Sequence, residues 1–234
     1  MRDRYGFLDL KPREIEDSGW IYAYGVYYPR HQAVRHQLSS WSRAVILAKR
    51  GAMEIIDRFG GLIAGMDALE RKLCDMVRPG VNYPEIHLAA HRLIGELLAA
   101  ERIVLCSAEA AVETGLTSVF FPHGIGHLLG LQVHDIGGHQ TAATGGTTPP
   151  SADHPFLRLT RTLEAGTVVT IEPGLYFIDL LLAKARADGR GRNIDWGKVA
   201  EFAPFGGVRI EDDVVASLAG PENLTRAAFD APAA

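Results

Sequence analysis

The sequence predicts an α+β fold, because helical patterns come first and strand patterns follow. Apolar residues recur at helical spacing from Leu62 to Val77 and again from Ile86 to Leu98. This spacing is typical of helices that bury one face. Residues 167–171 are β-branched throughout, and residues 207–215 form a second strand-like run. Such runs favour strands. The fold is expected to begin at about residue 60.

The boundaries of the two helices are marked by breakers and caps. Arg78-Pro79-Gly80 is expected to end the first helix, because proline and glycine interrupt helical geometry. Asn82 is expected to cap the second helix, with Pro84 in its first turn, where the missing N–H of proline costs nothing. We interpret this helical pair as scaffold.

The remaining segments are less regular. Residues 115–121 resemble the approach to a strand. Residues 137–150 are rich in glycine, threonine, alanine and proline, which predicts a loop long enough to be a lid or a binding loop. Residues 180–192 are expected to be an insertion with a basic end, and residues 218–234 a tail.

Composition narrows the class of protein. The chain has 234 residues, 47% of them hydrophobic, and a formal net charge of −4, which suits an ordinary globular protein. The small acidic excess offers no surface for nucleic acid or an anionic membrane. No apolar run approaches the roughly 20 residues of a membrane span. No secretory signal is visible, and two cysteines are too few for a disulfide framework. We therefore expect a cytoplasmic protein that binds neither nucleic acid nor membrane.

The N-terminal quarter differs from the rest. Residues 1–59 hold two of the three tryptophans and five of the seven tyrosines, yet they show no sustained helical or strand period. We leave 1–59 unassigned and expect one domain over residues 60–234.

Three histidines lie close together among glycines. His123 and His127 flank Gly124-Ile125-Gly126, and His134 follows shortly after. The glycines argue against a helix here, so the pair does not form the helical face of a zinc protease. An extended backbone would let the imidazoles project toward a common ligand. The alternative is a set of ordinary core or surface histidines, but a cluster of this kind favours a functional site.

Two glutamates follow strand-like runs further along the chain. Glu172 stands just before a Pro-Gly turn, and Glu211 shares a strand face with Arg209, because side chains alternate along a strand. Each has a simpler explanation: an exposed strand end for Glu172, and a salt bridge to Arg209 or another basic residue for Glu211. Two carboxylates and one imidazole, however, suit Mn²⁺, Co²⁺ or Zn²⁺, and such an ion can activate water for hydrolysis.

Three stretches together resemble a known family. FFPHGIGHLLGLQVHDIGG, TRTLEAGTVVTIEPGLYFI and PFGGVRIEDDVV are similar to sequences of the bacterial Xaa-Pro dipeptidases, or prolidases, which are pita-bread metallopeptidases. The resemblance runs from about residue 60 to the C-terminus, and several motifs in the right order make it specific. It implies a pita-bread catalytic domain, with a curved, largely antiparallel sheet flanked by helices. It also implies hydrolysis of Xaa-Pro dipeptides by a metal-activated water.

The resemblance also assigns the metal ligands. His127, Glu172 and Glu211 fall at ligand positions, with Glu211 bridging the two ions of the family and Glu172 also moving a proton. The ion is expected to be Mn²⁺, with Zn²⁺ or Co²⁺ as alternatives.

The substrate contacts follow from the same comparison. His123 and His134 fall where the family holds and polarises the scissile carbonyl, so His134 joins Glu172 as a catalytic residue. Arg158 falls where prolidases bind the carboxylate of the C-terminal proline, and Arg209 at another substrate-contacting position. Arginine suits this task because it binds a carboxylate through two parallel hydrogen bonds.

One part of the family pattern is missing. The family supplies two further aspartate ligands from a β-hairpin that should fall just before Gly60, and an N-terminal domain before that. Ile56-Asp57-Arg58 only echoes the first half of the hairpin. With three ligands remaining, we expect one ion or weak occupancy, and impaired hydrolysis unless residues 1–59 or a partner chain supply carboxylates.

Four alternatives remain open at this stage. The chain could be a pita-bread module that binds peptides without cleaving them, or a gene remnant with an incomplete fold. A mononuclear His/carboxylate oxygenase is the third, which we do not favour because the resemblance accounts for every motif together. The prolidase-type metallodipeptidase is the fourth, and the family also implies a possible homodimer.

Overall fold

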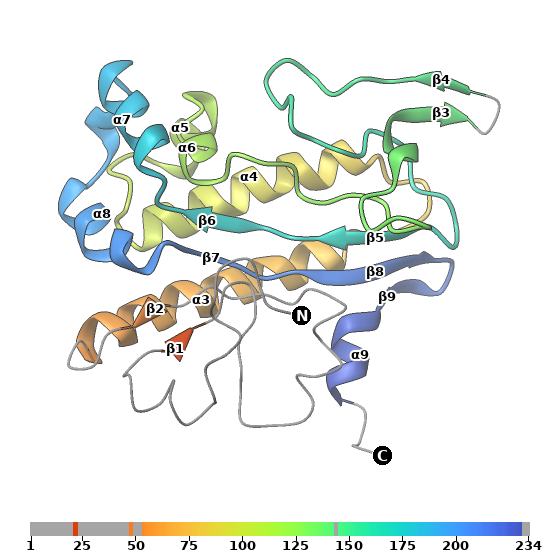
Figure 1. The fold of residues 1–234 in the computed structure, drawn as a ribbon, viewed down its shortest axis with the longest axis horizontal. Helices are drawn as coiled ribbons and strands as arrows, with labels where there is room; N and C mark the ends of the chain where they lie inside the picture. Colours follow the sequence, from red (N-terminus) through yellow and green to blue (C-terminus); the bar gives the residue numbers. More distant parts are fainter. Residues whose placement is uncertain (1–20, 23–46, 49–52, 143–144, 231–234) are drawn as a thin grey trace, which may run out of the picture.

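The structure is a computed structural model that describes residues 21–22, 47–48, 53–142 and 145–230. The prediction for residues 1–59 therefore lies largely outside the described residues. The described residues form long helices, paired strands and several short helices (Figure 1). This arrangement confirms the predicted α+β class.

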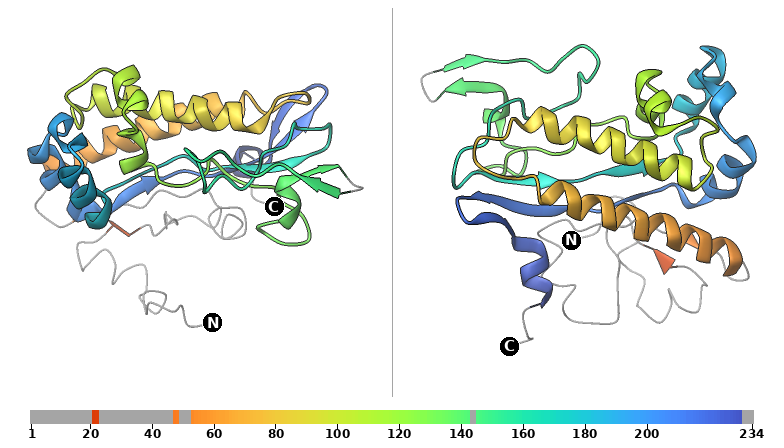
Figure 2. Two further views of the ribbon diagram at one scale, coloured as in Figure 1. Left: turned by 90° about the horizontal axis from the view of Figure 1, so that it is seen from above. Right: turned by 180° about the vertical axis from the view of Figure 1, so that it is seen from behind.

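The helical pair is present. Helix α3 spans Met53–Cys74 and helix α4 spans Tyr83–Ala100. Helix α3 begins earlier than the apolar pattern predicted, so the Asp57 echo of the missing hairpin lies on a helix. Residue Asn82 occupies the N-cap position of α4, but its side chain makes no capping hydrogen bond, so that part of the prediction was wrong. The two helices lie on one side of the strands (Figure 2).

Two antiparallel sheets are placed end to end at the centre of the fold. Strand β5 (Val168–Ile171) pairs with β8 (Asp212–Ser217), and β8 pairs with β9 (Gly220–Asn223). Strand β6 (Gly174–Tyr176) pairs with β7 (Gly207–Arg209). The run predicted as one strand over 207–215 is therefore interrupted after residue 209. The interruption lies opposite the break between β5 and β6.

Two segments differ from their sequence-based predictions. Residues 115–121 contain helix α6 (Thr117–Phe120), not the approach to a strand. Their β-prone side chains are mostly buried, and tertiary packing overrides local propensity. Residues 137–150 contain a short antiparallel hairpin, β3 (Gln140–Ala142) with β4 (Gly145–Thr147), in the middle of the predicted loop.

The remaining elements are short. They are β1 (Ile21–Tyr22), β2 (Leu47–Ala48), α5 (Ala108–Glu113), η1 (Ile136–His139), α7 (Asp179–Ala187), η2 (Arg190–Asn193), α8 (Trp196–Phe202), η3 (Ala203–Phe205) and α9 (Leu224–Asp230). The predicted insertion thus folds as α7 and η2. The predicted tail is structured as β9 and α9, which corrects that expectation.

Helix α9 is fixed by an arginine. The Arg226 guanidinium pairs with Asp212 on β8 and with Asp67 and Glu70 on α3. Both Glu70 and Asp212 are fully buried, and the buried Asp212 carboxylate needs such a partner. The last helix is therefore anchored to both layers of the fold.

Among the described residues, no helix combines the length and apolar character needed to cross a membrane.

Candidate metal centre

His127 lies on an extended segment that runs beside β5. Its backbone N–H donates to Thr170 Oγ1 at 3.0 Å, and its carbonyl accepts from Thr170 N at 3.0 Å. The backbone N–H of Glu172 donates to the Ile125 carbonyl at 2.8 Å. These bonds hold the segment as an additional edge of the sheet and place the His127 imidazole next to Glu172. The segment is not helical, as its glycines predicted.

Gly126 makes this close approach possible. Its φ of +157° is uncommon for other residues. A Cβ at this position would collide with the Thr170 carbonyl and with the Tyr83 hydroxyl. That hydroxyl donates to the same carbonyl at 2.7 Å. The close spacing of the segments that carry Gly126, Thr170 and Tyr83 therefore requires a residue without a side chain at position 126.

Glu172 and Glu211 enter the site from the two strand interruptions. The ladders on either side pair Ile171 with Asp212 and Gly174 with Arg209. The two glutamates therefore lie on neighbouring segments of the backbone, at the point where regular strand pairing stops. They are 9% and 3% exposed, and His127 is 2% exposed. One ligand atom from each of His127, Glu172 and Glu211 lies within 4.8 Å of the others. We refer to these residues as the three-ligand site.

The electrostatics of His127 suit a metal ligand. Burial is the main cause that lowers its pKa to about 4, and the nearby charges of His134, Arg158 and Arg209 lower it further. The imidazole is therefore neutral at pH 7. Its Nδ1 lies 2.9 Å from the Leu128 carbonyl, to which it donates. The other nitrogen, Nε2, is left unprotonated at 3.6 Å from Glu172 Oε1. Such a second hydrogen bond commonly fixes the tautomer of metal-binding histidines.

Arg209 lies between the two carboxylates. Its guanidinium is 3.2 Å from Glu172 Oε2 and 3.4 Å from Glu211 Oε2. The salt bridge considered as an alternative for Glu211 is therefore present, alongside the convergence of the ligands. The two side chains meet, although strand β7 ends at Arg209 and the predicted continuous strand does not include Glu211.

The other predicted site residues surround these groups. His134 is exposed, and its ring centroid is 4.4 Å from that of His127. His123 Nε2 is 3.0 Å from the Tyr176 hydroxyl, while its Nδ1 donates to the Gly124 carbonyl at 2.7 Å. Arg158 is exposed on a loop, and its charge reaches His127. The structure therefore brings all seven predicted residues into one region.

Sequence reasoning missed Tyr176 and Thr170. Burial raises the pKa of Tyr176 to about 12, so its hydroxyl keeps the proton that it donates to His123. Tyr176 stands four positions after Glu172, and the two-residue period of a strand places it on the same face. That period could have identified it. Nothing in the sequence marked Thr170 as the partner of His127.

The donor set fits a divalent ion. One imidazole nitrogen and two carboxylates, all buried and converging, are ligands that Zn²⁺, Co²⁺ and Mn²⁺ accept. A cation is also favoured by charge, because two buried carboxylates face one guanidinium.

Comparison with known proteins identifies the family of the chain. The sequence model described as metallopeptidase family M24 matches residues 62–217. An Xaa-Pro dipeptidase of Xanthomonas campestris is 49% identical over 174 residues, which cover 74% of this chain and 40% of the relative. An Xaa-Pro dipeptidase of Shewanella loihica is 50% identical over 168 residues, covering 72% of this chain and 38% of the relative. The chain thus spans about 40% of the length of the curated relatives it matches.

Solved structures show the same fold. An aminopeptidase of Pseudomonas aeruginosa matches with a TM-score of 0.53 and 24% identity, over 82% of this chain and 36% of the other. Aminopeptidase P of Escherichia coli, solved with the inhibitor Pro-Leu, matches with a TM-score of 0.53 and 25% identity, over 74% and 32%. The predicted pita-bread fold is therefore confirmed.

Proposed function

The chain belongs to metallopeptidase family M24, and from that premise we propose that it hydrolyses Xaa-Pro dipeptides with a metal-activated water. The observation that carries the proposal is the convergence of His127, Glu172 and Glu211 within 4.8 Å. Its support is the 49% identity to an Xaa-Pro dipeptidase over 174 residues, together with a family match over residues 62–217. The catalytic unit spans residues 60–234 in this proposal.

In this proposal His127, Glu172 and Glu211 hold a divalent ion. When bound, such an ion supplies a water of lowered pKa and an electrophile for a peptide carbonyl. Three ligands and an open position suffice for a catalytic metal. We expect one ion, with Mn²⁺ preferred, because a second cation would meet too little opposing charge among these ligands.

The other side chains act on the proton and the substrate. The Glu172 carboxylate accepts a proton from the attacking water and passes it to the leaving amine. His123 and His134 hold and polarise the scissile carbonyl. Arg158 is exposed and uncommitted to an ion pair in the described structure, so it binds the C-terminal carboxylate of the dipeptide. Arg209 orients the two carboxylates that it contacts.

The decisive test is proline release from Gly-Pro by the full chain, measured with and without Mn²⁺, together with metal content. We expect Mn²⁺-dependent release that Glu211→Gln abolishes. Glu222→Gln, which changes an exposed glutamate on β9, is the matched control and should retain the wild-type rate. Peptide binding without turnover in the Mn²⁺-loaded protein would instead support the non-catalytic module.

Two further expectations stay predictions. Light scattering of the full chain checks the homodimer, and fractionation of cells that express it checks the cytoplasmic location.

A further inference from the structure

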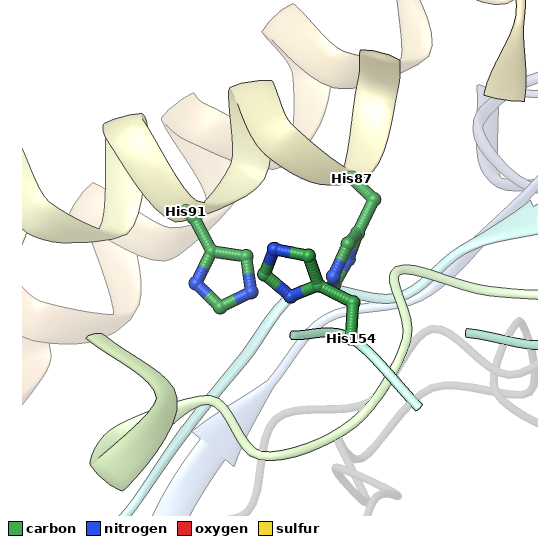
Figure 3. Close-up of side chains that lie close together, drawn as sticks. All are labelled: His87, His91 and His154. Atoms are coloured by element: carbon green, nitrogen blue, oxygen red, sulfur yellow. The ribbon is translucent and has the colours of Figure 1, made fainter. Parts of the chain in front are cut away.

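Three histidines outside the three-ligand site converge on one point. His87 and His91 are one turn apart on α4, and His154 approaches them from the loop before Arg158 (Figure 3). One nitrogen from each ring lies within 4.8 Å of the others. The ring centroid of His154 is 4.5 Å from His87 and 4.8 Å from His91. We call this group the histidine trio.

One member of the trio, His87, lacks hydrogen bonds at its ring nitrogens. His87 is 2% exposed, and neither of its ring nitrogens has a hydrogen-bond partner. A buried polar group without a partner costs free energy, so such a group in a folded protein requires an explanation. A bound ion at the centre of the trio would take the lone pair of one of these two nitrogens.

His91 is oriented as a ligand. Its Nδ1 lies 2.9 Å from Thr117 Oγ1. A donation from Nδ1 to the threonine would leave Nε2 unprotonated. This is the arrangement by which an outer partner fixes the tautomer of a metal-binding imidazole.

The trio is also in the required protonation state. Burial lowers the pKa of His87 to about 2 and that of His91 to about 3. Neutral imidazole is the form that binds metals. Three neighbouring imidazoles therefore present lone pairs, and not positive charges, at neutral pH.

A cavity gives access to the trio. It has a volume of about 180 Å³ and is lined by all three histidines together with Asp153, Lys184 and Arg190. Such a volume holds several water molecules. A water or a small anion can therefore occupy a fourth coordination position beside the three rings.

We propose that His87, His91 and His154 form a second metal site, which takes one Zn²⁺ ion with three imidazole nitrogens and a water from the cavity. Three nitrogen ligands and an open position make a complete tetrahedral zinc site. Imidazole favours Zn²⁺ over Mn²⁺, Mg²⁺ and Ca²⁺, which prefer oxygen. The trio therefore differs in metal preference from the carboxylate-rich three-ligand site.

The geometry requires only a small contraction. Zinc–nitrogen bonds of about 2.0–2.1 Å in a tetrahedron place the nitrogens about 3.3 Å apart. Rings whose nitrogens are within 4.8 Å of one another must therefore approach by at most about 1.5 Å. His154 lies on a loop, so its own approach requires no change in α4, whereas His87 and His91 must close their separation by rotation of their side chains.

A bound ion would join two parts of the fold. It would tie α4 to the segment that continues through Leu157 into Arg158. Zinc binding should therefore stabilise the folded state and fix the position of the Arg158 loop. This inference does not depend on the proposed peptidase activity, because it uses none of the three-ligand residues.

The test is Zn²⁺ titration of the full chain without a histidine tag, by calorimetry, and Co²⁺ substitution followed by visible absorption. The parent protein and every variant in this test carry Glu211→Gln, so that the three-ligand site does not contribute to the measurement. We expect one equivalent of Zn²⁺ and the strong visible bands of four-coordinate cobalt. His154→Ala should weaken Zn²⁺ binding by at least about 100-fold, since even the loss of an outer partner costs about 10–100-fold.

Two more variants make the result specific. His87→Leu should abolish the cobalt bands without loss of stability in metal-free protein, because that ring makes no hydrogen bond in the fold. Its metal-free unfolding curve shows that the variant folds. His139→Gln is the control: it removes a histidine whose Nε2 contacts the Leu157 carbonyl at 2.9 Å, and glutamine can donate the same bond. Its Zn²⁺ affinity should match that of the parent.

Two results would overturn the proposal. One is unchanged Zn²⁺ affinity in His154→Ala and His87→Leu. The other is the absence of binding by the Glu211→Gln parent at up to millimolar Zn²⁺. Failure of the peptidase assay affects neither measurement.

Discussion

Replacing Gly126 by alanine should separate the extended segment from β5. The added Cβ would collide with the Thr170 carbonyl and the Tyr83 hydroxyl, and both atoms are held by hydrogen bonds. The segment must move away, which weakens the bonds between His127 and Thr170, and between Glu172 N and the Ile125 carbonyl. The perturbation therefore reaches two of the three ligands through the backbone.

The size of the effect follows from these contacts. Overpacking of a well-packed site costs about 1–3 kcal/mol, and each weakened hydrogen bond contributes about 0.5–1.5 kcal/mol. Partial relaxation of the segment gives a loss of about 3 kcal/mol in the free energy of unfolding. In a chain of this size that corresponds to a fall in Tm of about 6–12 °C.

The assay compares two glycine-to-alanine variants by urea and thermal unfolding of metal-free protein. The control is Gly60→Ala, because a Cβ at this helical position meets no atom within 4 Å. It should stabilise the protein by about 0.5–1 kcal/mol. Equal unfolding midpoints for Gly126→Ala and the wild type would refute the reasoning that the segment depends on this glycine.

Three further predictions concern charge and the proton positions around the site. Arg209→Met should lower the metal-free unfolding free energy by about 2–3 kcal/mol, because two buried carboxylates lose their partner, and Mn²⁺ should then raise the Tm more than in the wild type. Burial, with the neighbouring Asp212 charge, raises the pKa of Glu70 to about 8. This carboxyl therefore stabilises the fold fully below its unfolded pKa of 4.5 and progressively less as pH rises toward 8, so Glu70→Gln should gain relative stability from pH 5 to pH 9 in urea unfolding. Tyr176→Phe removes the donor to His123 and should lower kcat for Gly-Pro by about tenfold with little change in KM, if the proposed activity holds.

Each of these has an outcome that contradicts it. A larger Mn²⁺ effect in the wild type than in Arg209→Met would show that the guanidinium does not compete with the cation. Parallel pH profiles for the wild type and Glu70→Gln would show that this carboxyl is ionised throughout. A change confined to KM in Tyr176→Phe would place the hydroxyl in binding alone.

The helices and the central strand could be predicted because their signals are local. A 3.6-residue apolar period defines α4, and a β-branched run defines β5, without reference to the rest of the chain. Helix α6 could not be predicted, since its β-prone side chains are helical only because they pack against α4 and β6. The segment 218–234 lacks a clear period, and the Arg226 ion pairs that order it come from residues far away in sequence.

The two candidate sites differ in the same respect. The candidate ligands at 127, 172 and 211 each stand in a distinctive local motif, so they could be predicted from the sequence before their convergence was visible. The histidine trio joins a helical pair at i and i+4 to His154 on a distant loop. The helical pair could have been noticed, but its third member is defined only by the tertiary structure.

The Arg226 network has a practical consequence for engineering this chain. Asp212 is the first residue of β8 and directly follows Glu211, so the support of that glutamate extends to the last helix. A fusion or truncation that unwinds α9 would remove the Arg226 cation from the buried Asp212 carboxylate, which lies next to the proposed ligand Glu211. Reporter tags are therefore better attached through a linker that leaves residues 224–230 intact. If a shortened version of the chain shows altered metal affinity, loss of the Arg226 ion pairs should be examined first.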